Sequence, residues 1–311
     1  MNDPVTNPGL KHLSGQIGAV LKGKDAAVKM AIVCLLGRGN LLIEDVPGVG
    51  KTTLACALAK ATDCTFQRIQ FTSDMMPSDI IGISIFSRET REFEFKTGPL
   101  FCNIILADEI NRTNPKTQSA LLEAMNEKKV TVEKKTFRLP EPFMVIATQN
   151  PIEYHGTFPL PESQLDRFMM RITLGYPSPE YEKAAVMEEP SFRLIERVGP
   201  VVSRHDIMRM QEEADKITVD DSLVDYLMEI VACTRRDDRI RLGASTRGAQ
   251  FFIRAVKAHA YYEGRDYAVP DDIKILAPLL LGHRLILKSG RFLSDGELII
   301  REIVEKVPVP V

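Results

Sequence analysis

The sequence predicts an α/β domain built on a parallel sheet, followed by a smaller helical domain. Short apolar segments alternate with helical patterns over the first part of the chain, which is typical of a parallel sheet covered by helices on both faces. The composition changes at residues 175–179, where two prolines and a glycine mark a boundary. Beyond that boundary the chain reads as helices, with no segment that predicts a strand. We therefore expect the α/β domain at residues 1–176 and the helical domain at residues 177–311.

The elements of the first domain follow from apolar periodicity and from the residues that break it. A helical pattern over residues 25–36 ends at a glycine-containing loop, residues 37–40. A short buried strand is then expected at residues 41–43, followed by a glycine-rich turn and a helix at residues 52–61. The remaining expected elements are strands at residues 65–69, 103–107, 143–148 and 169–174, and a helix at residues 116–127.

Helix start signals organise the second domain. Asp220 and Asp221 begin one helix, which runs to about residue 233, and Ser245 and Thr246 begin another, which runs to about residue 262. Pro270 and the acidic pair after it mark a third start, because proline and carboxylates favour the first turn of a helix.

Composition and charge limit the class of protein. The chain has 311 residues, of which 44% are hydrophobic and 26% charged, as in soluble globular proteins. A net charge of −2 argues mildly against a DNA-wrapping role, since nucleic-acid-binding domains usually carry a basic excess. Five cysteines without a CxxC pair predict neither a disulfide framework nor a zinc site. The N-terminal segment lacks the pattern of a secretion signal, and no apolar run reaches the roughly 20 residues of a membrane span. We expect a cytoplasmic protein with no membrane span.

The glycine-rich turn carries the first chemical signal. Gly48, Val49, Gly50, Lys51 and Thr52 stand between a predicted strand and a predicted helix. Glycines let backbone N–H groups surround phosphate oxygens, and the helix N-terminus adds a favourable dipole. The lysine reaches the β- and γ-phosphates, and the threonine hydroxyl is a ligand for Mg²⁺.

This pattern predicts a phosphate loop that binds ATP or ADP with Mg²⁺. The full eight-residue pattern has a first glycine where this chain has Asp45, so an ordinary glycine-rich turn is the alternative. The residues expected to contact the nucleotide are Asp45, Val46, Pro47, Gly48, Val49, Gly50, Lys51, Thr52 and Thr53.

A pair of carboxylates supports the phosphate-loop interpretation. Asp108 and Glu109 end the apolar segment 104–107, the arrangement of a Walker B segment. We expect Thr52 to bind Mg²⁺ through its hydroxyl and Asp108 to hold the ion through its water shell, while Glu109 polarises the attacking water. Mg²⁺ and Lys51 would spread the charge of the transition state. An acidic pair after a strand is by itself usually a solvated helix start, but its position after a phosphate loop favours ATP hydrolysis.

With these segments in place, the chain resembles the AAA+ ATPases and, within them, the MoxR family. The resemblance extends over residues 20–290 and rests on five further segments: GPLF at 98–101, DEINR at 108–112, PKTQSALLEAM at 115–125, ATQNP at 147–151 and LPESQLDRF at 160–168. It implies an AAA+ core, a helical lid domain, and assembly into a homo-oligomeric ring that is usually a hexamer.

The resemblance also implies roles for three further residues. Asn150 is similar to sensor 1, which orients the water, although an asparagine before proline is often only a turn former. Arg167 resembles the arginine finger that reaches the nucleotide of a neighbouring subunit; the alternative is a surface arginine paired with Asp166. Arg247 matches the sensor 2 position at the start of a lid helix. Arginine suits such roles because its planar guanidinium binds phosphate oxygens in a bidentate manner.

Two departures from the family pattern lie away from these contacts. His155 stands where relatives have an acidic residue, and we expect it to be a surface side chain. Gly23 and Lys24 stand where relatives more often have Gly-Gln. Neither change affects an expected phosphate, metal or water contact.

Two inserted elements bear on the substrate. Residues 83–96 look like the helix-2 insert of the family, and their Phe86, Phe93 and Phe95 either face a central pore or pack in the core. Residues 127–140 look like the pre-sensor-1 hairpin, which contains four lysines. Related helicases hold DNA with basic residues there, but solvated lysines are the simpler interpretation.

Three classes of function follow. The first is chaperone-like remodelling or maturation of a protein partner, which the resemblance links with von Willebrand factor A domain proteins. The second is a nucleic-acid translocase or helicase-like motor that uses the lysine-rich hairpin. The third is a nucleotide-switched scaffold without catalysis, which an intact set of Asp108, Glu109, Asn150 and Arg167 opposes. We expect the first.

Overall fold

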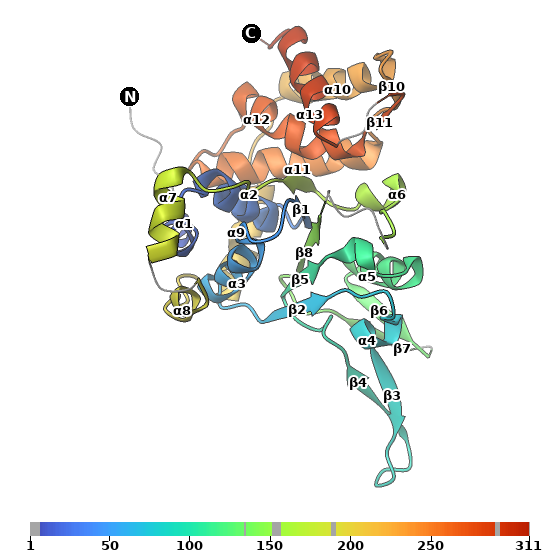
Figure 1. Ribbon diagram of the computed structural model, residues 1–311. Helices are drawn as coiled ribbons and strands as arrows, with labels where there is room; N and C mark the ends of the chain where they lie inside the picture. Colours follow the sequence, from blue (N-terminus) through green and yellow to red (C-terminus); the bar gives the residue numbers. More distant parts are fainter. Residues whose placement is uncertain (1–6, 134, 151–156, 188–190, 290–292, 311) are drawn as a thin grey trace.

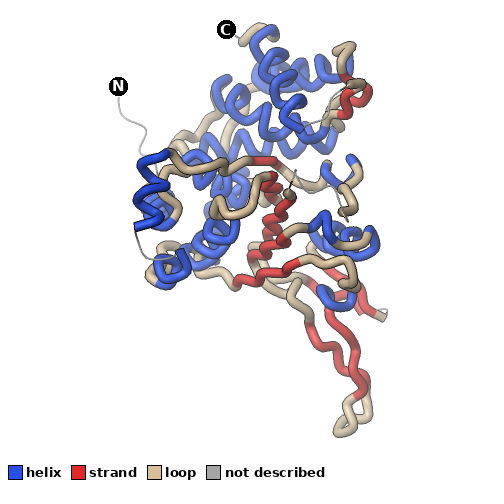
Figure 2. Tube along the Cα trace, in the orientation of Figure 1, coloured by secondary structure: helices blue, strands red, loops and turns tan. Residues whose placement is uncertain are grey.

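The computed structural model describes residues 7–133, 135–150, 157–187, 191–289 and 293–310. Its centre is a five-stranded parallel sheet in the order β2-β5-β8-β1-β9 (Figures 1 and 2). The strands are β1 Leu41–Glu44, β2 Phe66–Gln70, β5 Ile104–Asp108, β8 Met144–Gln149 and β9 Met170–Ile172. All five coincide with predicted strands, and the apolar segment predicted for the middle of the sheet, β5, is fully buried there.

Helices cover both faces of this sheet, as the alternation of elements predicts. On one face lie α1 Pro8–Val20, α2 Asp25–Leu36 and α3 Lys51–Ala61, which share an apolar cluster with Leu106 and Ile146. On the other face α4 Pro77–Ile81 and α5 Pro115–Glu127 pack against Ile105 and Val145. Because side chains of a strand point alternately to the two faces, neighbouring residues of β5 and β8 enter different cores.

Two antiparallel hairpins extend from the second face. β3 Gly82–Phe86 pairs with β4 Phe93–Thr97, and β6 Lys129–Val132 pairs with β7 Lys135–Arg138. Figure 1 shows the β3–β4 hairpin projecting away from the sheet. Phe95 stacks on Phe137 of the other hairpin with ring centroids 4.4 Å apart, whereas Phe86 and Phe93 are exposed. Core packing is therefore the wrong expectation for Phe86 and Phe93, whereas Phe95 is half-buried between the two hairpins.

The second part of the chain is helical, as predicted. Its elements are α7 Pro179–Met187, α8 Ser191–Glu196, α9 Arg204–Asp215, α10 Asp221–Arg236, α11 Thr246–Tyr262, α12 Pro270–Leu281, the 3-10 turn η2 Gly282–Arg284, and α13 Leu293–Lys306. The three predicted helix starts are confirmed. Asp220 and Ser245 cap their helices by accepting hydrogen bonds from the backbone N–H groups of Ser222 and Gly248.

The expectation that this part contains no strand is wrong. β10 Ile240–Leu242 pairs with β11 Ile286–Leu287 in a small antiparallel sheet. Strands of two or three residues are too short to show an alternating pattern, and only the fold brings these distant segments together. None of the helices in the described ranges is both long and apolar enough to cross a membrane.

Candidate active site at the ends of β1, β5 and β8

The glycine-rich turn links β1 to α3 in a backbone conformation that requires glycine. Gly48 and Gly50 have φ angles of +85° and +100°, in the region that side chains with a Cβ rarely adopt. Gly50 precedes the first residue of α3, and a Cβ at this position would lie 2.6 Å from a methyl group of Leu21. The Nζ of Lys51 donates a hydrogen bond to the carbonyl of Asp45, at 2.7 Å. The loop conformation is therefore already formed in the structure, and the hydrogen bond from Lys51 to Asp45 joins its two ends.

The carboxylate of Asp45 binds backbone groups of the protein itself. One carboxylate oxygen accepts from the N–H of Val46 at 2.9 Å, and the other accepts from the N–H groups of Leu174 and Gly175, both at 2.6 Å. The side chain is buried. It fastens the loop to the segment after β9, which gives a structural reason for an aspartate where the pattern has glycine.

A cavity of about 350 Å³ opens at the carboxyl ends of the central strands. Its lining includes Lys51 and Thr52 from the loop and α3, Asp108 and Glu109 from the end of β5, and Asn150 from the end of β8. The cavity is also lined by Pro47, Gly48, Gly50, Thr53, Arg68 and Gln70, whereas Asp45, Val46 and Val49 are outside its lining. Residues predicted from separate parts of the sequence thus meet in one cavity.

Both carboxylates of this cavity are held in place by hydrogen bonds. One oxygen of Asp108 accepts from the hydroxyl of Thr148 at 2.6 Å, and the other accepts from Nη2 of Arg68 at 2.6 Å. Glu109 accepts from Nε2 of Gln70 at 2.7 Å and pairs with Arg112 at 2.9 Å. Its backbone N–H donates to the same Thr148 hydroxyl, at 2.9 Å.

Glu109 also has a positive φ angle, +57°, which is uncommon for a residue other than glycine. Such conformations cost free energy and persist where surrounding contacts hold them. The Thr148 and Gln70 hydrogen bonds supply those contacts, so the direction of the Glu109 side chain is set by β8 and β2.

The sequence did not by itself indicate a role for Arg68, Gln70 or Thr148. Arg68 and Gln70 are two residues apart on the edge strand β2, and therefore share a face; Gln70 is the register partner of Asp108. Arg68 stands within the predicted strand 65–69 and Gln70 directly follows it, but the segment shows no regular polar alternation that would single them out. Thr148 is a buried polar residue near the end of an otherwise apolar strand.

Comparison with known proteins gives the family. Residues 40–170, which contain all the residues that line this cavity, match the family model described as ATPase family associated with various cellular activities, and residues 232–305 match an AAA lid domain. The chain is 39% identical to Chaperone MoxR1 of Mycobacterium tuberculosis, over 95% of this chain and 81% of that protein. Protein MoxR of Methylorubrum extorquens is 28% identical over 95% of this chain and 93% of its own length. The chain belongs to the MoxR family of AAA+ ATPases.

Further relatives extend over almost the whole length of this MoxR-family chain. The uncharacterized protein YeaC of Bacillus subtilis is 46% identical over 99% of this chain and 96% of its own. A crystal structure of an ATPase from Cytophaga hutchinsonii superposes with a TM-score of 0.88 at 40% identity, covering 97% of this chain and 95% of that one. The protein is accordingly a nucleotide-binding ATPase, and its α/β core and helical lid are those of AAA+ proteins.

The oxygen ligands in the cavity of this MoxR-family ATPase fit Mg²⁺. The hydroxyl of Thr52 and the carboxylate of Asp108 both line the cavity, and Mg²⁺ prefers such hard oxygen ligands. Arg68 holds one Asp108 oxygen in the structure, so a metal ion that needs this oxygen must displace the guanidinium.

The two predicted arginines of the MoxR-family site lie outside this cavity. Nη1 of Arg167 donates to the carbonyl of Leu122 in α5 at 2.7 Å, and Arg167 does not pair with Asp166, which binds Arg284 instead. Arg247 is exposed in the first turn of α11. Within the part of the chain that the structure describes, neither arginine lines this cavity.

Of the two departures from the family pattern, the structure shows contacts for Lys24 alone. Lys24 donates to the carbonyls of Gly175 at 3.0 Å and Tyr176 at 2.7 Å, so it holds the segment between core and lid. His155 lies outside the described residues.

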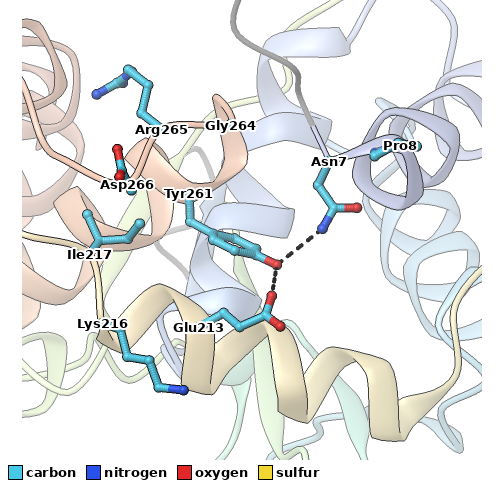
Figure 3. Close-up of a pocket in the computed structure, with 9 residues that line it drawn as sticks. All are labelled: Asn7, Pro8, Glu213, Lys216, Ile217, Tyr261, Gly264, Arg265 and Asp266. Carbon is cyan, nitrogen blue, oxygen red and sulfur yellow. Dashed lines mark hydrogen bonds between the residues drawn. The ribbon is translucent and has the colours of Figure 1, made fainter.

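A second, larger cavity of about 540 Å³ lies between the start of α1 and the ends of α9 and α11 (Figure 3). There the hydroxyl of Tyr261 donates to Glu213 and accepts from Asn7. Burial raises the pKa of Tyr261 to about 12, and the hydrogen bond to Glu213 adds to the shift. None of the predicted site residues lines this cavity.

Proposed function

We propose that this ATPase hydrolyses ATP with Mg²⁺ in the 350 Å³ cavity. The observation that carries the proposal is the convergence of Lys51, Thr52, Asp108, Glu109 and Asn150 at the ends of three neighbouring strands. In this proposal the loop and Lys51 bind the phosphates, and Thr52 and Asp108 hold the metal ion. Glu109 and Asn150 orient the attacking water, and Mg²⁺ supplies charge neutralisation when it is bound.

Glu109→Gln tests the assignment of the base. The substitution keeps the shape and the hydrogen-bonding capacity toward Gln70 but removes the carboxylate, so nucleotide binding should persist while phosphate release falls by about 100-fold or more. Glu89→Gln, on the exposed β3–β4 turn, is the matched control and should leave both unchanged. Phosphate release close to wild type in Glu109→Gln would show that another group activates the water.

We further propose that the protein acts as a homo-oligomeric ring, by family a hexamer, with Arg167 reaching a neighbouring subunit's nucleotide. Support comes from the position of Arg167, which lies outside its own cavity, with a buried Nε that has no hydrogen-bond partner among the described residues. Arg167→Ala and Glu109→Gln subunits should each be inactive, yet mixing them should restore part of the phosphate release. Proven mixed oligomers without any recovery would contradict a finger acting between subunits.

For the biological role we propose chaperone-like remodelling or maturation of a partner protein, including a von Willebrand factor A domain protein. Its support is the name of one relative, Chaperone MoxR1. The hairpin of residues 127–140 has less free positive charge for binding nucleic acid than its four lysines suggest. Lys129 pairs with Glu127 at 3.3 Å, and burial lowers the pKa of Lys128. Capture of a protein partner by the Glu109→Gln variant in ATP would support remodelling, whereas ATPase stimulation by DNA with steep salt dependence would favour the motor.

A further inference from the structure

The two acidic residues of the candidate active site are joined through one buried hydroxyl. The hydroxyl of Thr148 in β8 donates to Oδ1 of Asp108 at 2.6 Å and accepts from the backbone N–H of Glu109 at 2.9 Å. The Thr148 side chain is fully buried. A hydroxyl carries one hydrogen and a backbone N–H only donates, so the chain of bonds runs in one direction, from Glu109 through Thr148 to Asp108.

The Thr148 hydroxyl binds at the point where the strand pairing of β5 stops. On the β2 side the register pairs of β5 continue to Asp108. On the β8 side they end at Ala107, which is paired with Ala147. Beyond that pair, the hydroxyl of Thr148 binds the N–H of Glu109. A side chain of β8 thus supplies a hydrogen bond where the backbone pairing has ended.

The backbone of Glu109 needs such a bond. Its φ of +57° and ψ of +49° lie in the left-handed region, which a residue with a Cβ adopts at a cost in free energy. A hydrogen bond to the Glu109 N–H holds the peptide group that precedes this residue. The φ angle then determines the direction in which the Glu109 side chain leaves the backbone, so Thr148 contributes to the placement of the carboxylate.

The same hydroxyl orients the carboxylate of Asp108. Thr148 binds Oδ1 in the buried part of the site, whereas Oδ2 accepts two hydrogen bonds from Arg68, which lines the cavity. A rotation of the carboxylate would break the bond to Thr148, and a buried carboxylate oxygen without a donor costs free energy. Thr148 therefore keeps Oδ2 as the oxygen that faces the cavity.

Strand formation alone does not require a hydroxyl at this position. β8 is buried along its whole length, and residues 145–147, directly before Thr148, are valine, isoleucine and alanine. Valine has nearly the shape of threonine and a strong preference for strands, so it would suit β8 equally well. The hydroxyl of Thr148 is therefore explained by its two partners in the site.

We propose that Thr148 is a positioning residue for ATP hydrolysis, which acts through Asp108 and Glu109 at the same time. Its hydroxyl holds the Asp108 carboxylate with one oxygen toward the metal ion, and it holds the Glu109 backbone in the conformation that directs the carboxylate to the attacking water. This inference rests on the proposed function of the two acidic residues. Loss of the hydroxyl slows the chemical step, while ATP binding through the loop and Lys51 persists.

A series of substitutions at Thr148 tests the role of the hydroxyl. Thr148→Val removes the hydroxyl and keeps the shape, so kcat for phosphate release should fall by about 30- to 100-fold, as expected when catalytic groups are slightly misplaced. Thr148→Ser keeps the hydroxyl and should retain most of the wild-type kcat. Thr148→Cys, whose thiol is a weak donor, should lie between them. KM for ATP should stay within about twofold of wild type in each variant, the pattern of a lost transition-state interaction.

Amide hydrogen exchange of the nucleotide-free protein provides a measurement that is independent of activity. Exchange at the single amide of Glu109, resolved by fragmentation in a mass spectrometer, reports on the bond to Thr148. It should become about tenfold faster or more in Thr148→Val, where the acceptor is lost, and remain slow in Thr148→Ser.

Thr234→Val is the matched control, because Thr234 is equally buried and makes the same two kinds of bond in the lid. Its hydroxyl donates to the carbonyl of Val231 at 2.6 Å and accepts from the N–H of Ala244 at 3.0 Å. The control should lose stability in urea and exchange faster at Ala244. It should leave kcat, and exchange at Glu109, unchanged.

Glu109→Gln in the same assay separates this inference from the proposed function. A wild-type kcat in Thr148→Val, with kcat lost in Glu109→Gln, would overturn the role of Thr148 and leave the proposed function intact. A wild-type kcat in Glu109→Gln would refute the proposed function, and the positioning role with it.

Three further outcomes would also count against the role of Thr148. Equal losses of kcat in Thr148→Ser and Thr148→Val would assign the effect to packing rather than to the hydroxyl. Unchanged exchange at Glu109 in Thr148→Val would refute the hold on its backbone. An equal loss of kcat in Thr234→Val would assign the effect to general destabilisation. Should Thr148→Val fail to fold, the comparison of Thr148→Cys with Thr148→Ser decides the same question.

Discussion

At the scale of single residues, the chemistry of the cavity depends on what occupies the oxygens of Asp108. Thr148 holds one of them, and the half-exposed Arg68 holds the other. A guanidinium and a magnesium ion both neutralise a carboxylate, so a metal ion bound as proposed would compete with Arg68 for the same oxygen. Arg68 thereby keeps Asp108 paired when no metal ion is bound.

Replacement of this arginine should strengthen metal binding. A partly exposed ion pair contributes about 1 kcal/mol or less, so Arg68→Gln should lower the Mg²⁺ concentration that half-saturates nucleotide binding by up to about fivefold. A fluorescent nucleotide titrated with Mg²⁺ measures this. The control Arg88→Gln, at an exposed site on the β3–β4 hairpin, should show no change. The competition would be contradicted if Arg68→Gln raised the Mg²⁺ concentration that half-saturates nucleotide binding, or if only the control lowered it.

At the scale of elements, η2 presents a buried histidine to the turn before β9. His283 lies with Nε2 3.3 Å from the carbonyl of Phe168 and 2.9 Å from Nη1 of Arg284. Burial lowers the pKa of His283 well below its usual value, and the neighbouring charges of Arg284 and Arg171 lower it further. The ring is therefore neutral in the folded protein, where its Nε2 accepts from Arg284.

This histidine should make the fold sensitive to acid. Below the unfolded pKa of about 6.5 the unfolded chain binds a proton that the folded chain does not, so stability falls by up to about 1.4 kcal/mol per pH unit until the folded pKa is reached. Above the unfolded pKa, His283 adds no pH dependence to the free energy of unfolding. Urea unfolding of wild type and His283→Asn between pH 7.5 and 5 measures the slope, which should be smaller in the variant. His205→Asn, at an exposed site in α9, should keep the wild-type slope; equal slopes in all three proteins would contradict the assignment.

At the scale of the whole molecule, core and lid share one apolar cluster that runs from the sheet through α2 to α11 and α12. A buried charge network crosses the same boundary. Arg171 of β9 pairs with Glu44 at the end of β1 and with Glu297 of α13, both at 2.5 Å. Burial raises the pKa of Glu44, and the charge of Arg171 opposes the shift. The lid is therefore fixed to the strand that leads into the phosphate loop.

Removal of Arg171 should destabilise the whole protein rather than one part. Arg171→Met leaves two carboxylates in a buried site without a cation, which typically costs about 3–5 kcal/mol. Denaturant unfolding at pH 7 measures the loss, with Arg209→Met as the control at an exposed ion pair. A loss as small as that of the control would show that the two carboxylates are readily solvated.

The sequence predicted where the five strand segments lie along the chain, and it indicated the phosphate loop and the acidic pair, because each depends on local rules. Apolar runs, glycines before a helix and carboxylates after a strand are contiguous in the chain. The predicted domain boundary at residue 176 and the roles of Asn150, Arg167 and Arg247 stay predictions. The β10–β11 pair and the contacts of Asp45 were missed, because both join segments far apart in the sequence.

What the sequence by itself determined is therefore the family, the α/β core with its helical lid, and the candidate nucleotide residues. Only the tertiary structure decided which groups bind those residues: Arg68 and Thr148 at Asp108, Gln70 at Glu109, and Arg284 with Ser245 at Asp166. The physical reason is that hydrogen bonds and ion pairs act over a few ångströms in space. Their partners come from whichever strands and helices the fold places side by side, at any separation along the chain.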